Sequence, residues 1–398
     1  MTQGSCPFNF KESIMSRFKK KYLSFICCSL LTFVLYTANA CAQNQDYFPV
    51  RQNGKIGFID KTGTMVISPR FDSASTEDDV ACSEGLAVVK LGSRWGYIDM
   101  VGEFVIQPKF EFTPGLFHDG LAQAVIKSTD IEKKGPLDPS QKYIVNEETL
   151  GFINKTGEFV GELKFIEERT RFVDGMAKVR KGDKFGYVDK MGRFVIEPSF
   201  ANAEDFSEGL AAVRLEGHLV GLADERSEYK TKYGFIDKSG KFVIKPQFDS
   251  AESFSEGLAA VGMNSKNGYI DKTGKLVIAA RYDSAFQFSD GLAKVAIGDK
   301  SGFIDTRGNM VISPRFAYSG FGNSLNYRGF KEGLAAVEVN NKTGYIDKTG
   351  KIVIAATYKY GTDFNSGLAE VFIGSEPGMQ KSYLINKTGK VIWEHKTN

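Results

Sequence analysis

Short apolar runs alternate with polar turns along this chain, and one arrangement of them recurs. It is clearest in Gly234–Val261, which reads GFIDKSGKFVIKPQFDSAESFSEGLAAV. Apolar runs flank the polar tetrad Asp237–Gly240, which is typical of a β-hairpin, because Asp accepts turn hydrogen bonds and Gly supplies a positive φ. Pro246 cannot donate to a strand ladder and is expected to end the second strand. The apolar run Leu258–Val261 predicts a third strand, so each unit predicts three short antiparallel strands.

The hairpin motif occurs in eight good copies and one degenerate copy. The eight share a glycine followed by an aromatic residue, Ile or Val, and Asp or Asn, and begin at Gly57, Gly96, Gly151, Gly186, Gly234, Gly268, Gly302 and Gly344. The ninth copy has Tyr383 in the glycine position. The shortest spacing between these glycines is about 34 residues, the size of one supersecondary element, which indicates a tandem repeat.

A second marker, Gly-Leu-Ala or Gly-Met-Ala, follows each hairpin, and an acidic residue precedes all copies except the last, where Ser366 stands. Extra length falls after this marker at 126–150, 215–233 and 373–382, and after the Pro-Arg-Phe turn at 317–330. If the units stack regularly, the first three insertions project from one rim, where a binding site is often elaborated.

The aromatic residue after the hairpin glycine alternates between Phe and Tyr through eight units: Phe58, Tyr97, Phe152, Tyr187, Phe235, Tyr269, Phe303 and Tyr345. A buried Tyr needs a hydrogen-bond partner that a Phe does not. The alternation therefore predicts that units work in pairs with two different environments at this position.

The motifs resemble the WG-repeat (KWG-repeat) family. The residues that carry the resemblance are Arg94–Asp99 (RWGYID), Lys184–Asp189 (KFGYVD) and Lys232–Asp237 (KYGFID), and it extends from Asn53 to about Val391. The tryptophan of the family survives only at Trp95. The resemblance implies a β-rich repeat superstructure, usually in secreted or envelope-associated bacterial proteins, and implies no catalytic activity.

One unit buries too little apolar surface to fold alone, so neighbouring units must complete its core. The expected fold is all-β, a tandem array of three-stranded antiparallel units. An open β-superhelix or solenoid is favoured, because nine unequal three-stranded units do not match the usual four-stranded propeller blade and the degenerate last copy suggests an end. The alternative is a closed propeller-like ring.

The N-terminus has the pattern of a secretory signal peptide. From Met15, the expected start, a basic cluster precedes the apolar run Tyr22–Tyr36, which is short for a membrane-spanning helix. Cleavage after Ala42 competes with cleavage before Cys41, which would then carry lipid. The expected organisation is a leader at 1–42, a short linker at 43–52, and a repeat domain at 53–398.

Composition narrows the function classes. Five basic residues and one acidic residue lie in the leader, so 46 basic and 47 acidic residues remain, and this balance does not call for nucleic acid. Four of the five cysteines fall in or beside the leader, which leaves Cys82 without an intramolecular disulfide framework. The three histidines lack metal-ligand spacing, and the recurring aspartates already serve as turn residues, so neither a metal site, a cofactor nor a catalytic site is expected.

These features predict an exported, non-enzymatic scaffold, located in the periplasm, at the cell surface or in the medium, that binds an envelope polysaccharide or peptidoglycan, or a surface protein. Contact with a membrane is expected only through a lipid on Cys41. The alternative function is a hydrolase or inhibitor with a site built from the long insertions. The position before the hairpin glycine offers an aromatic and apolar ligand track. The other reading, packing on adjacent loops, is the commoner one for aromatic stripes in repeats. The residues at this position are Ile56, Trp95, Leu150, Phe185 and Tyr233.

Overall fold

The computed structural model describes residues 47–76, 82–134, 142–163, 170–215, 232–318, 329–374 and 381–395. In these ranges the chain contains only β-strands, turns and loops, and residues 46–398 belong to one compact unit. The expected leader, including Cys41, lies outside the described residues. Within the described part of the chain, no helix has the length and apolar character needed to span a bilayer.

The strands form nine small antiparallel sheets, each built from consecutive strands, which we call blades 1 to 9. Blades 1 to 3 contain β1 (Phe48–Gln52), β2 (Lys55–Ile59) and β3 (Met65–Phe71); β4 (Ser73–Ala74), β5 (Cys82–Ser83), β6 (Leu86–Leu91), β7 (Arg94–Ile98) and β8 (Phe104–Phe110); and β9 (Ala122–Lys134), β10 (Lys142–Ile153) and β11 (Phe159–Leu163). Blades 4 to 6 contain β12 (Phe172–Val173), β13 (Met176–Lys181), β14 (Lys184–Val188) and β15 (Phe194–Phe200); β16 (Asn202–Ala203), β17 (Ala211–Arg214), β18 (Tyr233–Ile236) and β19 (Phe242–Phe248); and β20 (Ser250–Ala251), β21 (Ala259–Met263), β22 (Lys266–Ile270) and β23 (Leu276–Tyr282). Blades 7 to 9 contain β24 (Ser284–Ser289), β25 (Leu292–Ile297), β26 (Lys300–Asp305) and β27 (Met310–Ala317); β28 (Phe330–Lys331), β29 (Leu334–Val339), β30 (Lys342–Asp347) and β31 (Ile352–Tyr358); and β32 (Tyr360–Gly361), β33 (Leu368–Ile373), β34 (Lys381–Asn386) and β35 (Val391–His395).

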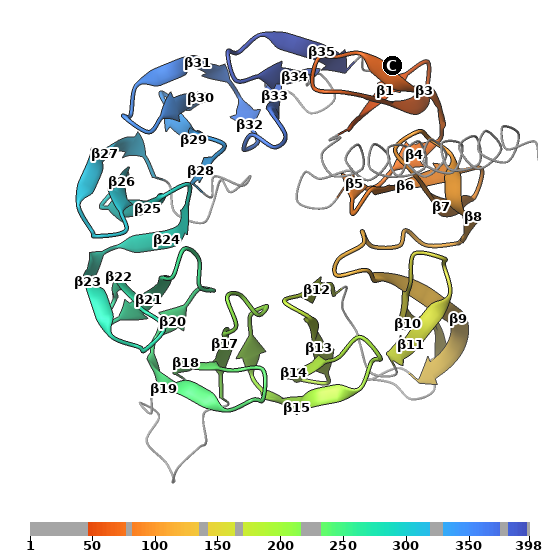
Figure 1. Cartoon of the computed structure of the whole chain (residues 1–398), viewed down its shortest axis with the longest axis horizontal. Helices are drawn as coiled ribbons and strands as arrows, with labels where there is room; N and C mark the ends of the chain where they lie inside the picture. The colour runs from red at the N-terminus through yellow and green to blue at the C-terminus, as the bar shows by residue number, and fades with distance from the viewer. Residues whose placement is uncertain are drawn as a thin grey trace, which may run out of the picture. The chain divides into compact units, whose positions relative to one another are not determined.

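The blades stand side by side around a closed ring, which is a nine-bladed β-propeller (Figure 1). The all-β prediction is confirmed, and the closed ring, given as the alternative, is the observed arrangement; the open array favoured by the strand count is wrong. That count missed the short first strand, such as β12, β16 or β20, which lies toward the centre and makes most blades four-stranded. The third long strand, such as β15 or β19, forms the outer edge.

The repeating sequence unit and the blade are offset from each other. A sequence unit begins at the hairpin motif. A blade begins two strands earlier, with its short first strand and the Gly-Leu-Ala strand. The Gly-Leu-Ala strand therefore shares a blade with the hairpin that follows it in the sequence, and the hairpin that precedes it belongs to the previous blade. In blade 1 this place is taken by β1, which lies inside residues 43–52, where a linker is expected.

The hairpin glycine is required by a close approach between strands. At Gly234 a Cβ would lie 2.6 Å from the carbonyl oxygen of Ile244 and 2.7 Å from the nitrogen of Pro246, well inside van der Waals contact. The pairing of β18 with β19 shifts register at this point, so the edge strand bulges over the glycine and continues through Pro246 instead of ending there. In blade 9 the glycine position holds Tyr383, and pairing with β35 runs through it from Ser382 to Leu384 without a shift.

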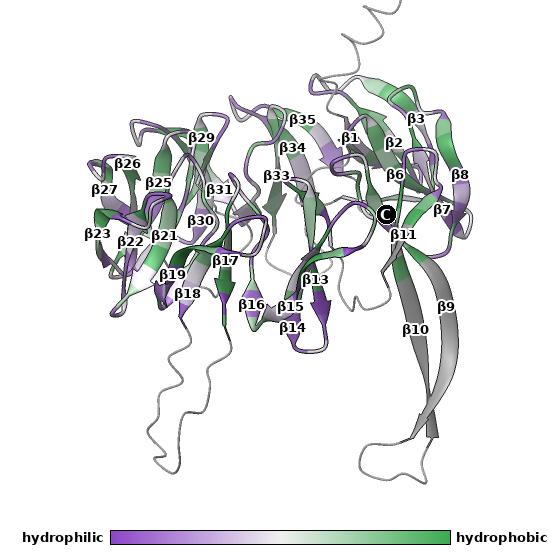
Figure 2. Cartoon of the chain, turned by 60° about the horizontal axis from the view of Figure 1, so that its bottom comes forward, coloured by the Kyte–Doolittle hydropathy of each residue, from purple (hydrophilic) through white to green (hydrophobic). Residues whose placement is uncertain are grey.

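The hydrophobic cores lie between blades. One cluster joins Tyr187 and Ile196 of blade 4 to Phe206 and Val213 of blade 5, and the next joins Phe235 to Phe254 in the same way. Figure 2 shows hydrophobic and hydrophilic colours mixed along the strands and the hydrophilic colour at many turns. Each blade therefore depends on both neighbours for burial, as predicted for units that cannot fold alone.

The Phe and Tyr positions make two kinds of contact between blades. Each of the four tyrosines is fully buried, and its hydroxyl donates to a backbone carbonyl of the next blade's inner segment: Tyr97 to Gly115 at 2.7 Å, Tyr187 to Glu204 at 2.7 Å, Tyr269 to Phe286 at 2.8 Å and Tyr345 to Thr362 at 2.8 Å. Phe at the intervening positions has no hydroxyl to donate. The predicted hydrogen-bond partner of each tyrosine hydroxyl is confirmed, and these bonds link blades 2 with 3, 4 with 5, 6 with 7, and 8 with 9.

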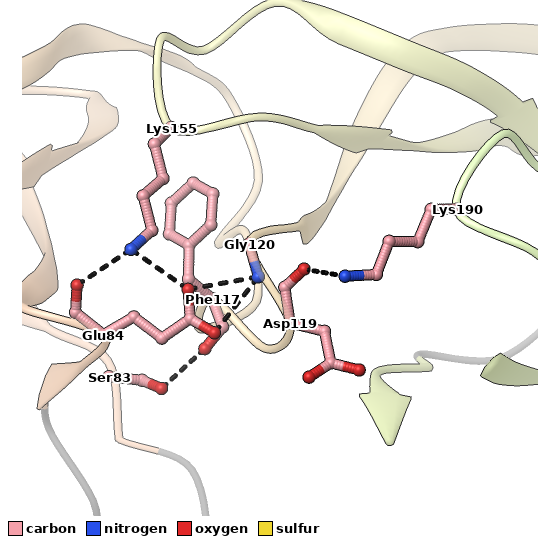
Figure 3. Close-up of polar contacts among 7 residues, drawn as sticks. All are labelled: Ser83, Glu84, Phe117, Asp119, Gly120, Lys155 and Lys190. Carbon is pink, nitrogen blue, oxygen red and sulfur yellow. Dashed lines mark hydrogen bonds and ion pairs between the residues drawn. The ribbon is translucent and has the colours of Figure 1, made fainter. Parts of the chain in front are cut away.

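A second link uses the acidic residue before each Gly-Leu-Ala glycine. Its carboxylate accepts a hydrogen bond from the equivalent glycine N–H of the next blade, as Glu84 does from Gly120 at 3.1 Å (Figure 3). We call this the acid–glycine contact. Seven such contacts occur among the described residues, pairing Glu84, Asp119, Asp174, Glu208, Glu256, Asp290 and Glu332 with Gly120, Gly175, Gly209, Gly257, Gly291, Gly333 and Gly367.

Turn lysines reinforce several of these contacts. Lys155 donates to the carbonyl oxygen of Glu84 and lies 3.1 Å from its carboxylate, and Lys190 donates to the carbonyl oxygen of Asp119 (Figure 3). The acidic residues adopt a positive φ, 51° for Glu84 and 53° for Asp119, which costs energy for a side chain other than glycine. The carboxylate of each acid makes its contact from this strained backbone position.

The joint between blades 9 and 1, which we call the seam, is built differently. In the described residues no sheet contains strands from both ends of the chain, so the ring closes through side chains. The seam cluster has four buried residues, Val50, Ile59, Leu368 and Leu384. Ser366 stands where the other blades have an acid, and its φ is 55°.

Candidate functional site

The inner side of the ring differs in polarity from blade to blade. One position shows this difference: the third residue after the Gly-Leu-Ala glycine, on the strand next to the short first strand. In the antiparallel register this residue is paired with the aromatic residue of the hairpin motif, as Lys178 is with Tyr187. It is Val or Ala in four blades and polar or charged in the other four that carry the motif: Gln123, Lys178, Lys294 and Glu370.

A cavity lies on the inner side of blades 2 to 5, and two of these polar residues, Gln123 and Lys178, contribute to its lining. Its volume is about 440 Å³, within the range of ligand pockets in proteins. We call it the wall pocket, and its lining consists of Ser75, Thr76, Pro114, Gly115, Leu116, Gln123, Thr170, Arg171, Lys178 and Asp205.

Three charged side chains from two blades meet in the wall pocket. Arg171, just before β12, lies 3.7 Å from Asp205, which follows β16, and Lys178 on β13 lies 4.0 Å from the same carboxylate. The side chains are 35% (Arg171), 28% (Lys178) and 31% (Asp205) exposed, so they are neither surface groups nor fully buried ones. Two cations therefore share one carboxylate at distances longer than a direct hydrogen bond.

Backbone contacts hold this wall in place. The backbone N–H of Thr170 donates to Oε1 of Gln123 at 2.9 Å, and the Thr170 hydroxyl donates to the carbonyl oxygen of Lys178 at 2.5 Å. The tyrosine contacts of Tyr97 and Tyr187 fix Gly115 and Glu204 on either side. The wall is thus preorganised by contacts between blades.

Glu204 borders the charged group of the wall pocket. Burial raises the pKa of its carboxyl above the usual value, with the neighbouring carboxylates of Glu252 and Asp205 adding to the rise and Lys178 opposing it. Glu204 therefore protonates more readily than an ordinary glutamate as the pH falls.

A smaller cavity of about 100 Å³ lies at the seam. Its lining includes Pro49 of blade 1 and Asp363 and Glu370 of blade 9. His395 Nε2 lies 3.9 Å from Glu370, and burial lowers the pKa of His395 while the Glu370 charge opposes that shift.

Lys294 occupies the same strand position in blade 7 and lies beside two aromatic rings. Its ammonium lies 5.7 Å from the ring of Phe286 and 5.8 Å from that of Tyr318, and the residue is buried. Desolvation by burial lowers the pKa of Lys294, and the charges of Asp363 and Glu338 oppose the shift.

Four of the residues predicted to form a ligand track belong to, or pack against, the hydrophobic clusters between blades: Ile56, Trp95, Phe185 and Tyr233. Ile56 and Trp95 are buried core residues, whereas Leu150, Phe185 and Tyr233 are half-buried. Cations cover several of the rings: Lys90 lies over Trp95, Arg180 and Lys178 over Phe185, and Arg214 over Tyr233. Phe185, 6.0 Å from the Lys178 ammonium, connects the predicted residues to the wall pocket.

Sequence reasoning missed Arg171, Lys178 and Asp205, although Lys178 left a signal. Its position is apolar in four units, so a lysine there departs from the core pattern. Arg171 and Asp205 belong to irregular inner segments whose alignment with Lys178 depends on how consecutive blades face each other.

The structure also places the insertions and Cys82. The insertions at 126–150, 215–233 and 373–382 all join the same two strands of a blade; in blade 3 the strands themselves lengthen, with β9 pairing β10 from Ala122 and Ile153 out to Lys134 and Lys142. Cys82 is partly buried and packs against the core cluster of blades 1 and 2. In the described residues, no group of three or more His, Cys, Asp or Glu side chains is arranged to hold a metal ion.

A family model described as WG containing repeat matches the chain eight times, at residues 56–95, 95–128, 151–185, 185–217, 233–266, 268–300, 302–342 and 344–375. No curated protein matches the chain. Among solved structures, the chain resembles the crystal structure of a eukaryotic initiation factor, with a TM-score of 0.59, 11% identity, and coverage of 88% of this chain and 96% of that chain. It also matches Hsv2 of Kluyveromyces lactis with a TM-score of 0.33, 11% identity, and coverage of 72% and 89%. At these identities the likeness to the initiation factor concerns the fold alone.

Proposed function

This chain belongs to the WG-repeat family, and we propose that it is an exported, non-enzymatic ring scaffold that binds a polysaccharide or peptidoglycan of the cell envelope. The observation that carries the proposal is the wall pocket, a polar cavity of about 440 Å³ whose walls come from four consecutive blades. Export rests on the signal-peptide pattern of the leader, from Met15 to the cleavage positions at Cys41 and Ala42.

The form of the pocket supports binding rather than catalysis. Its charged residues are two cations and one carboxylate, with hydroxyl and amide groups around them. General acid and base catalysis of glycoside cleavage commonly uses a pair of carboxyl groups that flank the scissile bond. Asp205 is the only carboxyl group among the residues that line the described pocket.

A direct test is to measure thermal stabilisation and pull-down of the purified chain with peptidoglycan and with a panel of glycans. Saturable stabilisation by a glycan, reduced in a folded Lys178→Ala variant, is the expected result. Incubation with the bound glycan should leave its chain length unchanged, whereas release of shorter products would identify a hydrolase. Trp95→Ala and Phe185→Ala test the sequence-predicted track in the same assay: loss at Phe185 alone assigns binding to the wall pocket, and equal loss at both assigns it to the track.

A surface protein is the second candidate partner, favoured by the lengthened hairpin of blade 3. The strands β9 and β10 have 13 and 12 residues, whereas the equivalent strands of blade 4 have six and five. If no glycan stabilises the chain, shortening residues 126–150 and, separately, 215–233 to tight turns should abolish capture of a protein partner from the envelope fraction. Capture that survives both deletions would exclude the insertions as the interface.

A further inference from the structure

One rim of the ring carries more positive charge over blades 1, 2 and 4 than over blades 6 to 8. This rim, which we call the loop rim, is formed by the turns that join β1 to β2 in blade 1 and the Gly-Leu-Ala strand to the next strand in the other blades. On blades 1, 2 and 4 the five-residue segments 51–55, 90–94 and 180–184 contain seven basic residues and one acidic residue. The equivalent segments of blades 6 to 8, which are 262–266, 296–300 and 338–342, contain three basic and two acidic residues.

Most of this difference comes from one strand position, the fifth residue after the Gly-Leu-Ala glycine. In the antiparallel register it is paired with the residue before the hairpin glycine, as Lys90 is with Trp95. In blade 1 the same register pairs Arg51 with Ile56. The position is occupied in blade 3 by Val125 and in blades 6 to 9 by Gly262, Ala296, Glu338 and Phe372. In the remaining four blades it is basic, and we call these residues the basic row: Arg51, Lys90, Arg180 and Arg214.

The contacts of three members of the basic row leave their charge in place. The ammonium of Lys90 lies 5.7 Å from the ring of Trp95, and the guanidinium of Arg214 lies 5.6 Å from the ring of Tyr233. Arg51 is exposed and donates to a backbone carbonyl of its own turn at 2.8 Å. Rings and carbonyl oxygens attract a cation without neutralising it. In the ranges that the structure describes, none of the three forms an ion pair with a carboxylate.

The other basic position of the loop rim is paired with an acid in blades of both halves of the ring. Its residue stands two before the hairpin glycine, as in the pair of Lys55 with Asp72 at 2.5 Å and of Lys266 with Asp283 at 2.6 Å. The hydrogen bond from Lys55, together with the charges of Lys55 and Lys90, holds the pKa of the Asp72 carboxyl below its usual value. Asp72 is thus shared by two lysines, and the basic row adds charge to cations that are already matched.

Arg180, the fourth member of the row, connects it to the wall pocket. Its guanidinium lies 5.7 Å from the ring of Phe185, and the ammonium of Lys178, which lines the wall pocket, lies 6.0 Å from the same ring. Arg180 is also engaged in its own turn, where Nε donates to a backbone carbonyl at 2.9 Å and the guanidinium lies 3.7 Å from Asp183. The charge argument therefore rests on the other three members, and Arg180 supplies the path to the pocket.

Resting on the proposed function, we propose that the loop rim of blades 1 to 5 binds a linear anionic polysaccharide, whose carboxylate or phosphodiester groups lie on the basic row. A polymer that repeats its anionic group can engage several cations at once, which raises the overall affinity above that of one contact. Arginine suits both groups, because its planar guanidinium can donate two parallel hydrogen bonds to carboxylate or phosphate oxygens. Beyond Arg180 the polymer can continue to the wall pocket.

The test is fluorescence anisotropy of the purified chain with labelled polymers of equal length. Polyglucuronate carries carboxylates, a glycan with phosphodiester links carries phosphates, and dextran is the neutral comparison. The better anionic polymer is expected to bind roughly tenfold or more tightly than dextran, and it identifies the anionic group. Its affinity should fall as salt is raised from about 50 to about 300 mM, because salt screens exposed charges.

Variants locate the site. Arg51→Gln, Lys90→Gln and Arg214→Gln should each weaken binding of the anionic polymer roughly two- to fivefold, as for partly exposed ion pairs, and together by roughly tenfold or more. The matched control is Lys342→Gln, because Lys342 is an exposed lysine of the same rim in blade 8. It removes the same charge and should change binding by less than about twofold. Thermal unfolding of each variant verifies that it is folded.

The outcomes separate this inference from the proposed function. Affinity for the anionic polymers no higher than for dextran, or equal weakening by Lys342→Gln and Arg214→Gln, overturns the basic row as the site but keeps a glycan-binding scaffold. Loss of binding in Lys178→Ala without loss in the triple variant assigns the polymer to the wall pocket alone and also overturns it. Tighter binding of a DNA duplex than of either anionic polysaccharide replaces the polysaccharide with polyanions in general. Binding of neither peptidoglycan nor any of these polymers at millimolar concentration contradicts both proposals.

Discussion

The seven consecutive joints from blade 2 to blade 9 differ from the seam between blades 9 and 1 in the contacts that hold neighbouring blades together. Along the former, acid–glycine contacts occur at every joint and tyrosine contacts at every second joint. The seam has Ser366 in place of the acid, Tyr383 in place of the hairpin glycine, and a core of four buried residues. The same polar contacts thus recur from joint to joint, whereas the cluster described at the seam consists of apolar side chains.

The largest expected effect comes from the glycine under the bulge. Gly234→Ala should destabilise the chain by about 1–3 kcal/mol or more, because the new Cβ would lie 2.6 Å from the Ile244 carbonyl oxygen and overpacking is costly. Chemical denaturation measures the change. At the seam blade the same position already holds a side chain, so Tyr383→Ala should cost only the packing of the lost ring. A Gly234→Ala variant as stable as the parent would show that the bulge relaxes freely.

The tyrosine contacts come next in size. Tyr187→Phe should cost about 1–2 kcal/mol, since it leaves the buried Glu204 carbonyl oxygen without that donor. Double replacement with Tyr269→Phe, two joints away, should cost the sum, because distant independent sites are additive. Thermal or urea unfolding provides the measurement, and the reverse change Phe235→Tyr serves as a control that should not stabilise unless a carbonyl is within reach. Unchanged stability in Tyr187→Phe would contradict a role for the alternation in joining blade pairs.

The acid–glycine contact can be removed from a joint or added at the seam. Glu208→Ser removes the acceptor for Gly257 and the partner of Lys272, and should cost about 1 kcal/mol, the net value of a hydrogen bond, since exposed ion pairs add little. Ser366→Glu places an acid at the seam. The described residues of blade 1 include no glycine in the place of the Gly-Leu-Ala glycine to donate to it, so the change should alter stability by less than about 0.5 kcal/mol. Equal effects of the two changes would contradict the distinction between joints and seam.

The smallest expected effect is a pH dependence at the seam. Burial lowers the folded-state pKa of His395 below its unfolded value of about 6.5, so the unfolded state binds more protons below that pH. The contribution of His395 is therefore present above about pH 6.5 and lost as the pH falls through the folded pKa. As the pH falls from 7 to 5 the intrinsic rate of amide hydrogen exchange decreases, and exchange in β1 and β35 should be in excess of the rate that this decrease alone predicts. His395→Asn should remove this excess, and its persistence would assign the effect to other groups.

The hairpin strands and the repeat were predictable because each is determined by a few consecutive residues. Asp237 and Gly240 close a turn locally, and the hydrogen bonds from Ser239 and Lys241 to the Asp237 carboxylate confirm that role. Closure of the ring was not predictable in this way. It depends on β1, whose sequence FPVRQ lacks the Gly-Leu-Ala marker, and on short first strands of two residues.

The wall pocket escaped prediction for a related reason. Lys178 and Asp205 are 27 residues apart and belong to different blades. Their meeting follows from the angle between blades, which the pattern within one unit does not specify. Of the residues chosen from the sequence, Trp95 and Ile56 are buried in the core, and Phe185 lies beside the charged group of the pocket.

The offset between sequence unit and blade has a consequence for how such a ring can change in size. Each unit of the chain completes one blade and starts the next, so inserting or removing one whole unit alters the number of blades while leaving every strand partnered. Because the two ends meet through side chains such as Val50 and Leu384 and not through a shared sheet, no strand register has to be conserved across the closure. The number of blades therefore follows the number of sequence units. The contact between the first and last blades, made by side chains, does not itself fix that number.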